Sequence, residues 1–92
     1  MPRLQWMVGN RGFGLEIEDA EIVIGGRHAE IQVPRATRSR TYARVFSDGA
    51  GVWIESLHVD GVRVNGAIVQ RAQLGNRDVI RVEELELQFW AE

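Results

Sequence analysis

The sequence predicts an all-β protein, a β-sandwich built from about ten short strands with glycine-rich turns and no significant helix. Three observations support this prediction. Apolar and polar residues alternate in short segments along the whole chain, turn-forming residues separate the segments, and no segment keeps the 3.6-residue period of an amphipathic helix. An open barrel is the alternative arrangement of the same strands. With 92 residues the chain is expected to form a single domain, residues 1–92.

The alternating segments follow one another from the first residues to the last. Each segment places its inward-facing residues at every second position, which is the pattern of a strand with one buried face. In chain order the expected inward positions are Leu4, Trp6 and Val8; Phe13, Leu15 and Ile17; Ile22 and Ile24; Ile31 and Val33; Thr41, Ala43 and Val45; Val52 and Ile54; Val62 and Val64; Ile80 and Val82; and Leu85, Leu87 and Phe89.

Turn-forming residues mark the junctions between these segments. Glycine, Asp-Gly and Asn-Gly are typical of tight hairpins because they adopt the positive φ that such turns require. We predict turns at residues 9–14, 25–26, 47–51, 60–61, 65–66 and 74–77, and a loop over residues 34–41, where Pro34 precedes a stretch without alternation.

Composition limits the classes of function that the chain can have. The 45% hydrophobic and 26% charged residues are ordinary for a folded protein and argue against a disordered chain. The absence of cysteine excludes disulfides, zinc ribbons and thiol nucleophiles. The longest aliphatic run, residues 22–24, is far shorter than the roughly 20 apolar residues of a membrane span. We therefore expect no membrane insertion, and without a secretory signal a cytoplasmic location is the default.

No group of side chains suggests catalysis or metal binding. His28 and His58 both lie near turn glycines, and two ligands are too few to fix a metal ion. Glu83, Glu84 and Glu86 are expected to form a solvated face in or beside the last hairpin. The chain has neither a nucleophile elbow nor a glycine-rich phosphate loop followed by a helix. We predict that the protein is not an enzyme and uses no cofactor and no metal.

Charge is unevenly distributed along the chain. Eleven arginines, thirteen acidic residues and no lysine give a net charge of −2, which argues against a nucleic-acid-binding protein. Residues 27–44 contain five arginines and one acid, a sum of +4, whereas residues 78–92 contain five acids and one arginine, a sum of −4. The loop at residues 34–41 has three arginines, three hydroxyl side chains and no acid. Guanidinium groups match phosphate geometry well, so this loop is either anion-binding or simply solvated.

Five short motifs occur in an order that resembles one known family. They are Ile-Val-Ile-Gly-Gly-Arg at residues 22–27, Ser-Arg-Thr-Tyr-Ala at 39–43, Asp-Gly-Val-Arg-Val-Asn-Gly at 60–66, Asp-Val-Ile-Arg at 78–81 and Leu-Glu-Leu-Gln-Phe at 85–89. Their order and spacing are similar to those of the forkhead-associated (FHA) domain, and the resemblance covers essentially the whole chain. It implies an FHA-type β-sandwich of about eleven short strands. It also implies that loops at one end recognise a phosphothreonine-containing partner.

The resemblance assigns candidate phosphopeptide-binding residues. Arg27 corresponds to the arginine after the glycine that ends the third strand, and Ser39 corresponds to the serine whose hydroxyl binds phosphate. Arg40 follows that serine, where the family often has a basic or polar phosphate contact. The complete expected set is Arg27, Ser39, Arg40, Thr41, Asp60 and Gly61.

Two positions depart from the family pattern. Tyr42 stands where the family has a histidine that organises the pocket, and Asp60 replaces an asparagine that hydrogen-bonds the peptide backbone. A carboxylate lacks the amide donor and repels a phosphate within a Debye length of about 8 Å. The segments at residues 25–31 and 57–60 are also shorter than the corresponding segments of the family. These departures imply an alternative, a degenerate FHA-like scaffold that binds its partner independently of phosphorylation, as in secretion-apparatus or assembly proteins. In both cases we expect a protein partner and a role as a signalling adaptor or as part of a larger assembly.

Overall fold

The computed structural model describes residues 1–18, 21–34 and 40–91, which form eleven β-strands and no helix. The strands are β1 (Arg3–Val8), β2 (Arg11–Glu16), β3 (Ile22–Gly25), β4 (Ile31–Gln32), β5 (Thr41–Ser47), β6 (Val52–Ser56), β7 (Val62–Val64), β8 (Ala67–Val69), β9 (Arg71–Gln73), β10 (Val79–Val82) and β11 (Leu85–Trp90). The all-β prediction and the eleven strands that the resemblance implied are confirmed. In this part of the chain no helix could cross a membrane.

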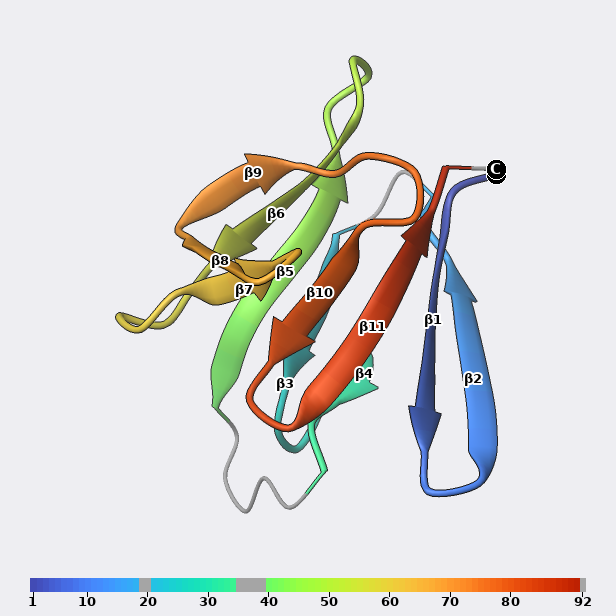
Figure 1. Cartoon of the computed structure of the whole chain (residues 1–92), viewed down its shortest axis with the longest axis vertical. Helices are drawn as coiled ribbons and strands as arrows, with labels where there is room; N and C mark the ends of the chain where they lie inside the picture. The colour runs from blue at the N-terminus through green and yellow to red at the C-terminus, as the bar shows by residue number, and fades with distance from the viewer. Residues whose placement is uncertain (19–20, 35–39, 92) are drawn as a thin grey trace.

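The strands form two sheets that share one apolar core (Figure 1). One sheet has six strands in the order β2-β1-β11-β10-β7-β8, and the other has five strands in the order β4-β3-β5-β6-β9. Strand β4 runs parallel to β3, whereas β3 pairs with β5 in the antiparallel direction, as do β5 and β6. The predicted sandwich is therefore confirmed over the open barrel.

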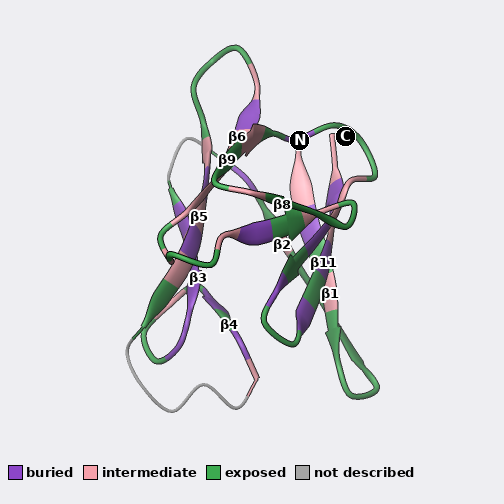
Figure 2. Cartoon of the chain, turned by 60° about the vertical axis from the view of Figure 1, so that its left-hand side comes forward, coloured by how far each residue is buried: buried purple, intermediate pink, exposed green. Residues whose placement is uncertain are grey.

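Most of the inward positions of the alternating segments form the core (Figure 2). Val8, Phe13 and Thr41 were also expected to face inward, but they are exposed, because they lie at strand ends or on the edge strand β2. Leu87 and Phe89 of β11 are at most 2% exposed, and Val45 and Ile54 of the facing sheet are completely buried. No charged or polar side chain is buried among the described residues. Because burying one such aliphatic or aromatic side chain contributes roughly 1.5–3 kcal/mol, apolar burial between the sheets is the main stabilising term.

The turns show how short polar sequences connect the strands. Asn65 and Gly66 both have positive φ, 52° and 87°, which is the backbone of the two-residue hairpin turn that Asn-Gly predicts. Asp48 accepts hydrogen bonds from the backbone N–H groups of Ala50 and Gly51, both at 3.0 Å, and so fixes the connection between β5 and β6.

Two predictions about local structure were wrong. The predicted turn at residues 9–14 is only a two-residue turn, because β2 begins at Arg11 and contains Gly12 and Gly14. The short strands β8 and β9 were not predicted, because each has only three residues and offers too few positions for an alternating pattern to be recognised. Ala67 and Ile68 of β8 are both exposed.

Candidate functional site

The first part of the candidate site is the turn between β3 and β4. The Gly26 N–H donates a hydrogen bond to the Arg40 carbonyl at 2.7 Å, which holds the end of β3 against the beginning of β5. Gly25 is required by this close approach, because a Cβ atom there would collide with the Arg40 carbonyl oxygen and lie 3.1 Å from the Thr41 Cα. Arg27 follows directly and is exposed.

The second part is the segment that leads into β5. Ser39, the predicted phosphate-binding serine, lies outside the described residues, as do Arg35 and Arg38. Arg40 and Thr41 are described, and both are exposed. Neither Arg27 nor Arg40 forms an ion pair with any residue in the described ranges. The structure therefore leaves two guanidinium groups available beside the start of β5.

The third part is the loop between β6 and β7, residues 57–61. The Leu57 N–H donates to the Tyr42 carbonyl at 2.8 Å, which attaches the loop to β5. The Ser56 hydroxyl donates to the His58 carbonyl at 2.7 Å and accepts a hydrogen bond from the His58 N–H at 3.2 Å. Gly61 closes the loop with a φ of 77°, a left-handed conformation that favours glycine. Three segments thus meet around the first residues of β5.

Side chains also connect the loop to β5. The ring centroids of Tyr42 and His58 are 5.7 Å apart, and the planes are tilted by 42°. Tyr42 stands at the position where the resemblance expects a histidine, and the histidine of this contact comes instead from the neighbouring loop. The contact was not predicted, since His58 was expected to be a surface or loop histidine, and its side chain is only 22% exposed.

Asp60 presents a negative charge at the same end. Its side chain is 83% exposed, and its Oδ2 atom lies 3.4 Å from His58 Nδ1. The Asp60 backbone N–H donates to the same nitrogen at 3.3 Å, so Nδ1 acts as an acceptor when the imidazole is neutral. The carboxylate that replaces the family amide therefore faces solvent, where an approaching ligand can meet it.

The same loop carries apolar side chains that sequence reasoning did not assign to the site. Val59 is 86% exposed and Leu57 is 45% exposed. The sequence did contain a signal for them: both are large apolar residues within a segment that the resemblance treats as a recognition loop. They supply apolar contact area next to the charged groups.

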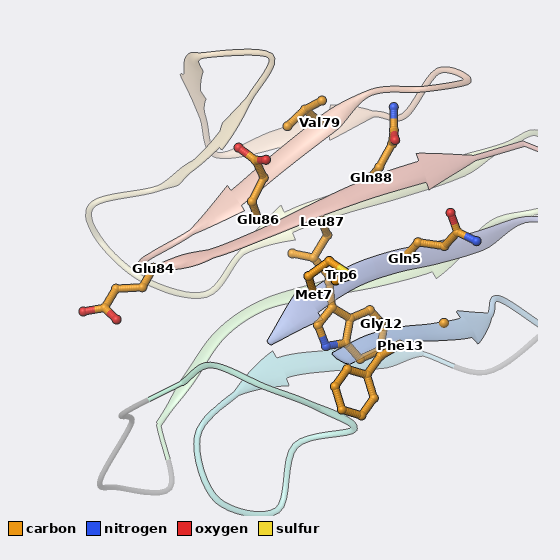
Figure 3. A pocket seen from close by; sticks show the side chains of 11 residues that line it. Gln5, Trp6, Met7, Gly12, Phe13, Val79, Glu84, Glu86, Leu87 and Gln88 are labelled. Atoms are coloured by element: carbon orange, nitrogen blue, oxygen red, sulfur yellow. The ribbon is translucent and has the colours of Figure 1, made fainter. Parts of the chain in front are cut away.

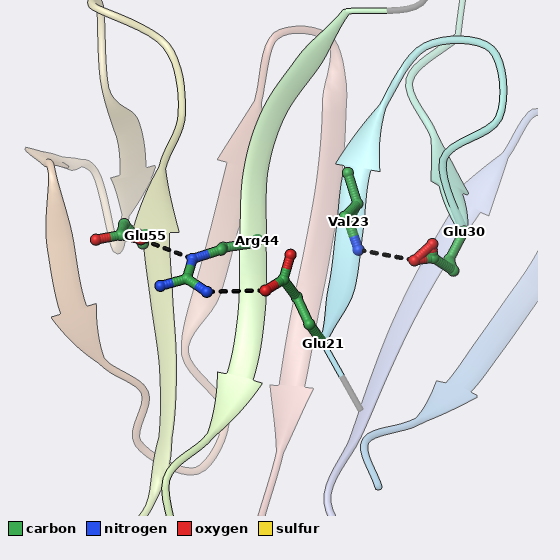
Figure 4. A network of polar contacts seen from close by, with 5 residues as sticks. All are labelled: Glu21, Val23, Glu30, Arg44 and Glu55. Atoms are coloured by element: carbon green, nitrogen blue, oxygen red, sulfur yellow. Dashed lines mark hydrogen bonds and ion pairs between the residues drawn. The ribbon is translucent and has the colours of Figure 1, made fainter. Parts of the chain in front are cut away.

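Arg44 belongs to the arginine-rich stretch, but it lies on the strand and not in the loops. Its guanidinium donates hydrogen bonds to Glu21 at 2.8 Å and to Glu55 at 2.6 Å (Figure 4). Two hydrogen bonds raise the pKa of Arg44 above its ordinary value, and the one to Glu21 has a larger effect than the one to Glu55. The guanidinium of Arg44 is charged at physiological pH. The local sum of +4 therefore overstates the cationic charge available to a ligand.

Histidine and acidic side chains also occur at this end. No group of three or more histidine, cysteine, aspartate and glutamate side chains within them is arranged to hold a metal ion. His28 lies in the β3–β4 turn, is exposed and has a left-handed φ of 77°. Within the described residues, these loops carry the guanidinium groups of Arg27 and Arg40, exposed apolar side chains and the solvent-facing carboxylate of Asp60.

A β-sandwich with such a loop surface at one end belongs to the class of protein-binding β-sandwich domains. No protein-family model matches the sequence, and no curated protein matches it either. Solved structures do match. The FhaA FHA domain, complexed with the intracellular domain of Rv3910, is 30% identical with a TM-score of 0.82; the match covers 97% of this chain and 99% of that one.

Two further structures extend the comparison. One, from a study of phosphothreonine-dependent FHA domain interactions, is 30% identical with a TM-score of 0.80 and coverage of 99% of this chain and 96% of that chain. The other is Mycobacterium tuberculosis EmbR in complex with a low affinity phosphopeptide, with 26% identity, a TM-score of 0.81 and coverage of 99% and 24%, respectively. The chain belongs to the FHA domain family, as the resemblance indicated.

Proposed function

We propose that this chain is a non-enzymatic interaction module that recognises a phosphothreonine-containing protein through the loops around the start of β5. The observation that supports this most directly is the position of Arg27 and Arg40. Both are exposed and free of ion pairs within the described residues, and the Gly26–Arg40 hydrogen bond joins the segments that carry them. A dianionic phosphate would receive charge-assisted hydrogen bonds from both guanidinium groups, each contributing about 1.5–3 kcal/mol.

Ser39, Thr41 and Gly61 complete the proposed site. Ser39 supplies a hydroxyl to the phosphate by analogy with the family, and exposed Thr41 continues the same edge of the site. Gly61, with its left-handed φ, would allow the β6–β7 loop to bring Asp60 beside the ligand. The similar structures that were solved with a phosphopeptide or in a study of phosphothreonine-dependent interactions support this assignment.

The test is a titration with phosphothreonine peptide libraries. We expect binding by the unmodified protein, no binding of the same peptides without phosphate, and a loss of at least tenfold in affinity for Arg27→Ala and for Ser39→Ala. Arg71→Ala is the matched control, because Arg71 lies on β9 against the rings of Phe46 and Trp53. Failure of the unmodified protein to bind any phosphothreonine peptide would exclude the proposed function.

A second candidate function is phosphate-independent binding of a protein partner. The exposed side chains of Leu57 and Val59 favour it, as does the solvent-facing carboxylate of Asp60. This function predicts that a partner captured by the domain remains bound after phosphatase treatment. It also predicts that Val59→Ser weakens binding more than Arg27→Ala does, whereas phosphothreonine recognition predicts the reverse order. Replacing Asp60 by asparagine should improve phosphopeptide affinity only if phosphate is the ligand.

A further inference from the structure

The four edge strands of the two sheets are very different in length. Strand β2 has six residues, whereas β8 and β9 have three each and β4 has two. Short edge strands offer little to a further strand, but a long exposed edge is a template for pairing with another chain. Strand β2 is the outermost strand on the right in Figure 1. It is therefore the edge of this molecule that is most able to pair.

The register of the first hairpin shows which backbone groups β2 leaves free. Val8 and Arg11 flank the two-residue turn and form a hydrogen-bonded pair, as does every second pair along the hairpin. The hydrogen bond from the Ile17 N–H to the Pro2 carbonyl, at 2.7 Å, continues this alternation. The N–H and C=O groups of Gly12, Gly14 and Glu16 therefore point away from β1. Two of these three residues are glycines, so Glu16 is the only one of the three with a side chain beside the free backbone groups.

Exposed apolar side chains gather on the same hairpin. Met7 is 58% exposed, and Val8 and Phe13 are each 40% exposed. The Phe13 ring stacks on Trp6, with centroids 5.8 Å apart and planes 14° apart. Figure 3 shows the two rings side by side. A shallow groove of about 670 Å³ lies along these strands, lined in part by Met7, Gly12 and Phe13. The strand also has no proline, lysine or bulge, which are the features that commonly protect an edge.

We propose that β2 pairs in the antiparallel direction with β2 of a second copy of this chain, so that the two six-stranded sheets become continuous. A two-fold axis between antiparallel strands is perpendicular to the sheet, so residues that face each other must lie on the same side. Phe13 opposite Phe13 of the second copy meets this condition. It also places Gly12 opposite Gly14 of the second copy, where their free backbone groups pair.

The side chains of the hairpin favour a second copy over an unrelated strand. The two Phe13 rings would extend the existing stack into a ladder of four rings, and aromatic cross-strand pairs are favourable. On the other side of the sheet, glycine faces glycine, so nothing hinders close approach. Arg11 and Glu16 make the strand electrically neutral, so two copies do not repel each other. One pair of strands buries less than the about 1,600 Å² of a standard interface, so the dimer is weak and depends on concentration.

The absence of cysteine provides a direct test of the register. A single cysteine at Phe13 would face its own copy across the axis, at a Cα separation of about 4.5 Å, within the range of a disulfide. We expect Phe13→Cys to form a disulfide-linked dimer under mild oxidation. The control is Ile68→Cys, on the opposite edge of the same sheet, where the side chain is 58% exposed. Equal rates of disulfide formation by both variants would overturn the proposal.

Sedimentation equilibrium tests the pairing without a covalent bond. We expect the unmodified protein to change from monomer to dimer as its concentration rises, and Gly14→Pro to remain monomeric, since proline removes an N–H that the sheet itself does not use. Ile68→Pro, at an outward-facing N–H of β8, is the matched control and should still dimerise. If Gly14→Pro lowers Tm, Phe13→Lys serves the same purpose. A protein that is monomeric at every concentration, or a dimer that persists in both β2 variants, would refute the pairing.

Discussion

The substitution Gly25→Ala tests whether the close approach of β3 and β5 builds the candidate site. The added methyl group would collide with the Arg40 carbonyl oxygen, and it would also lie 3.3 Å from the Arg40 carbonyl carbon and 3.1 Å from the Thr41 Cα. All of these are backbone atoms that no side-chain rotation can move. The two strands must separate, and the hydrogen bond from Gly26 to Arg40 lengthens or breaks.

The size of the effect follows from these contacts. Inserting a methyl group into a tightly packed region costs about 1–3 kcal/mol, and losing one backbone hydrogen bond costs about 0.5–1.5 kcal/mol. We therefore expect Gly25→Ala to lower the free energy of unfolding by about 2–4 kcal/mol. For a domain of this size that corresponds to a decrease in Tm of about 10–25 °C. A domain with an ordinary stability of about 5–15 kcal/mol remains folded in the cold and can still be assayed.

The assay is urea unfolding followed by tryptophan fluorescence, with phosphopeptide affinity measured on the folded variant. Gly75→Ala is the matched control, because a Cβ atom there would lie 3.6 Å or more from its neighbours, an ordinary van der Waals distance. We expect this control to change stability by less than about 0.5 kcal/mol and to leave affinity unchanged. If Gly25→Ala were as stable as the control, the close approach of β3 to Arg40 would not exist in the protein.

Three further predictions concern other parts of the chain. Gly61→Ala should lower the free energy of unfolding by about 2–3 kcal/mol, because the left-handed φ is strained and the Cβ atom would lie 2.9 Å from Ile68 Cγ2; an unchanged urea midpoint would contradict this. Glu83→Gly should raise the free energy of unfolding by about 0.5–1 kcal/mol, because Glu83 has a left-handed φ of 54° in the β10–β11 turn and glycine adopts this φ without strain. A lower Tm would show that no strain is relieved. Arg44→Met should lower Tm in low salt by more than in high salt, since salt screens the lost ion pairs; a loss independent of salt would indicate packing instead.

Hydropathy predicted the strands whose two faces have different surroundings. In β11 the buried Leu85, Leu87 and Phe89 alternate with more exposed polar residues, and the sequence pattern identified the strand. It identified β2 only in part: Phe13 and Leu15 were assigned to a strand, but Gly12 and Gly14 resemble turn residues, so the beginning of the strand at Arg11 was missed. These glycines lie on the outer face of an edge strand, where no core requires a side chain. The same absence of side chains is what leaves the edge open.

The candidate site could be predicted only in part, because its geometry depends on strand register. The arginine count and the resemblance both directed attention to Arg27 and Arg40, which the structure leaves free of ion pairs within the described residues. The contact between Tyr42 and His58 could not be foreseen, since it follows from the pairing of β5 with β6, in which Ala43 lies opposite Ser56. Charge counting likewise could not distinguish Arg44, which is held by two glutamates, from an arginine in a loop.

The charges of the site limit how it can reach useful affinity. The two charge-assisted hydrogen bonds proposed for Arg27 and Arg40 would contribute about 3–6 kcal/mol together, whereas micromolar binding requires about 8 kcal/mol. The exposed carboxylate of Asp60 would repel the phosphate and subtract from that sum. The difference must come from backbone contacts and from apolar side chains such as Val59, so the peptide residues around the phosphothreonine should matter strongly for binding.

Dimerisation through β2 would change this limit. Antiparallel strands would place the two proposed phosphate sites at opposite ends of the dimer, so a partner with one phosphothreonine would gain nothing from the second copy. A partner with two phosphothreonines on a linker that spans the dimer gains from the raised effective concentration, which can increase overall affinity by about 10²–10⁴-fold. A doubly phosphorylated peptide should therefore bind more tightly than a singly phosphorylated one only if its linker is long enough, and Gly14→Pro should abolish that difference while leaving the single-site affinity unchanged.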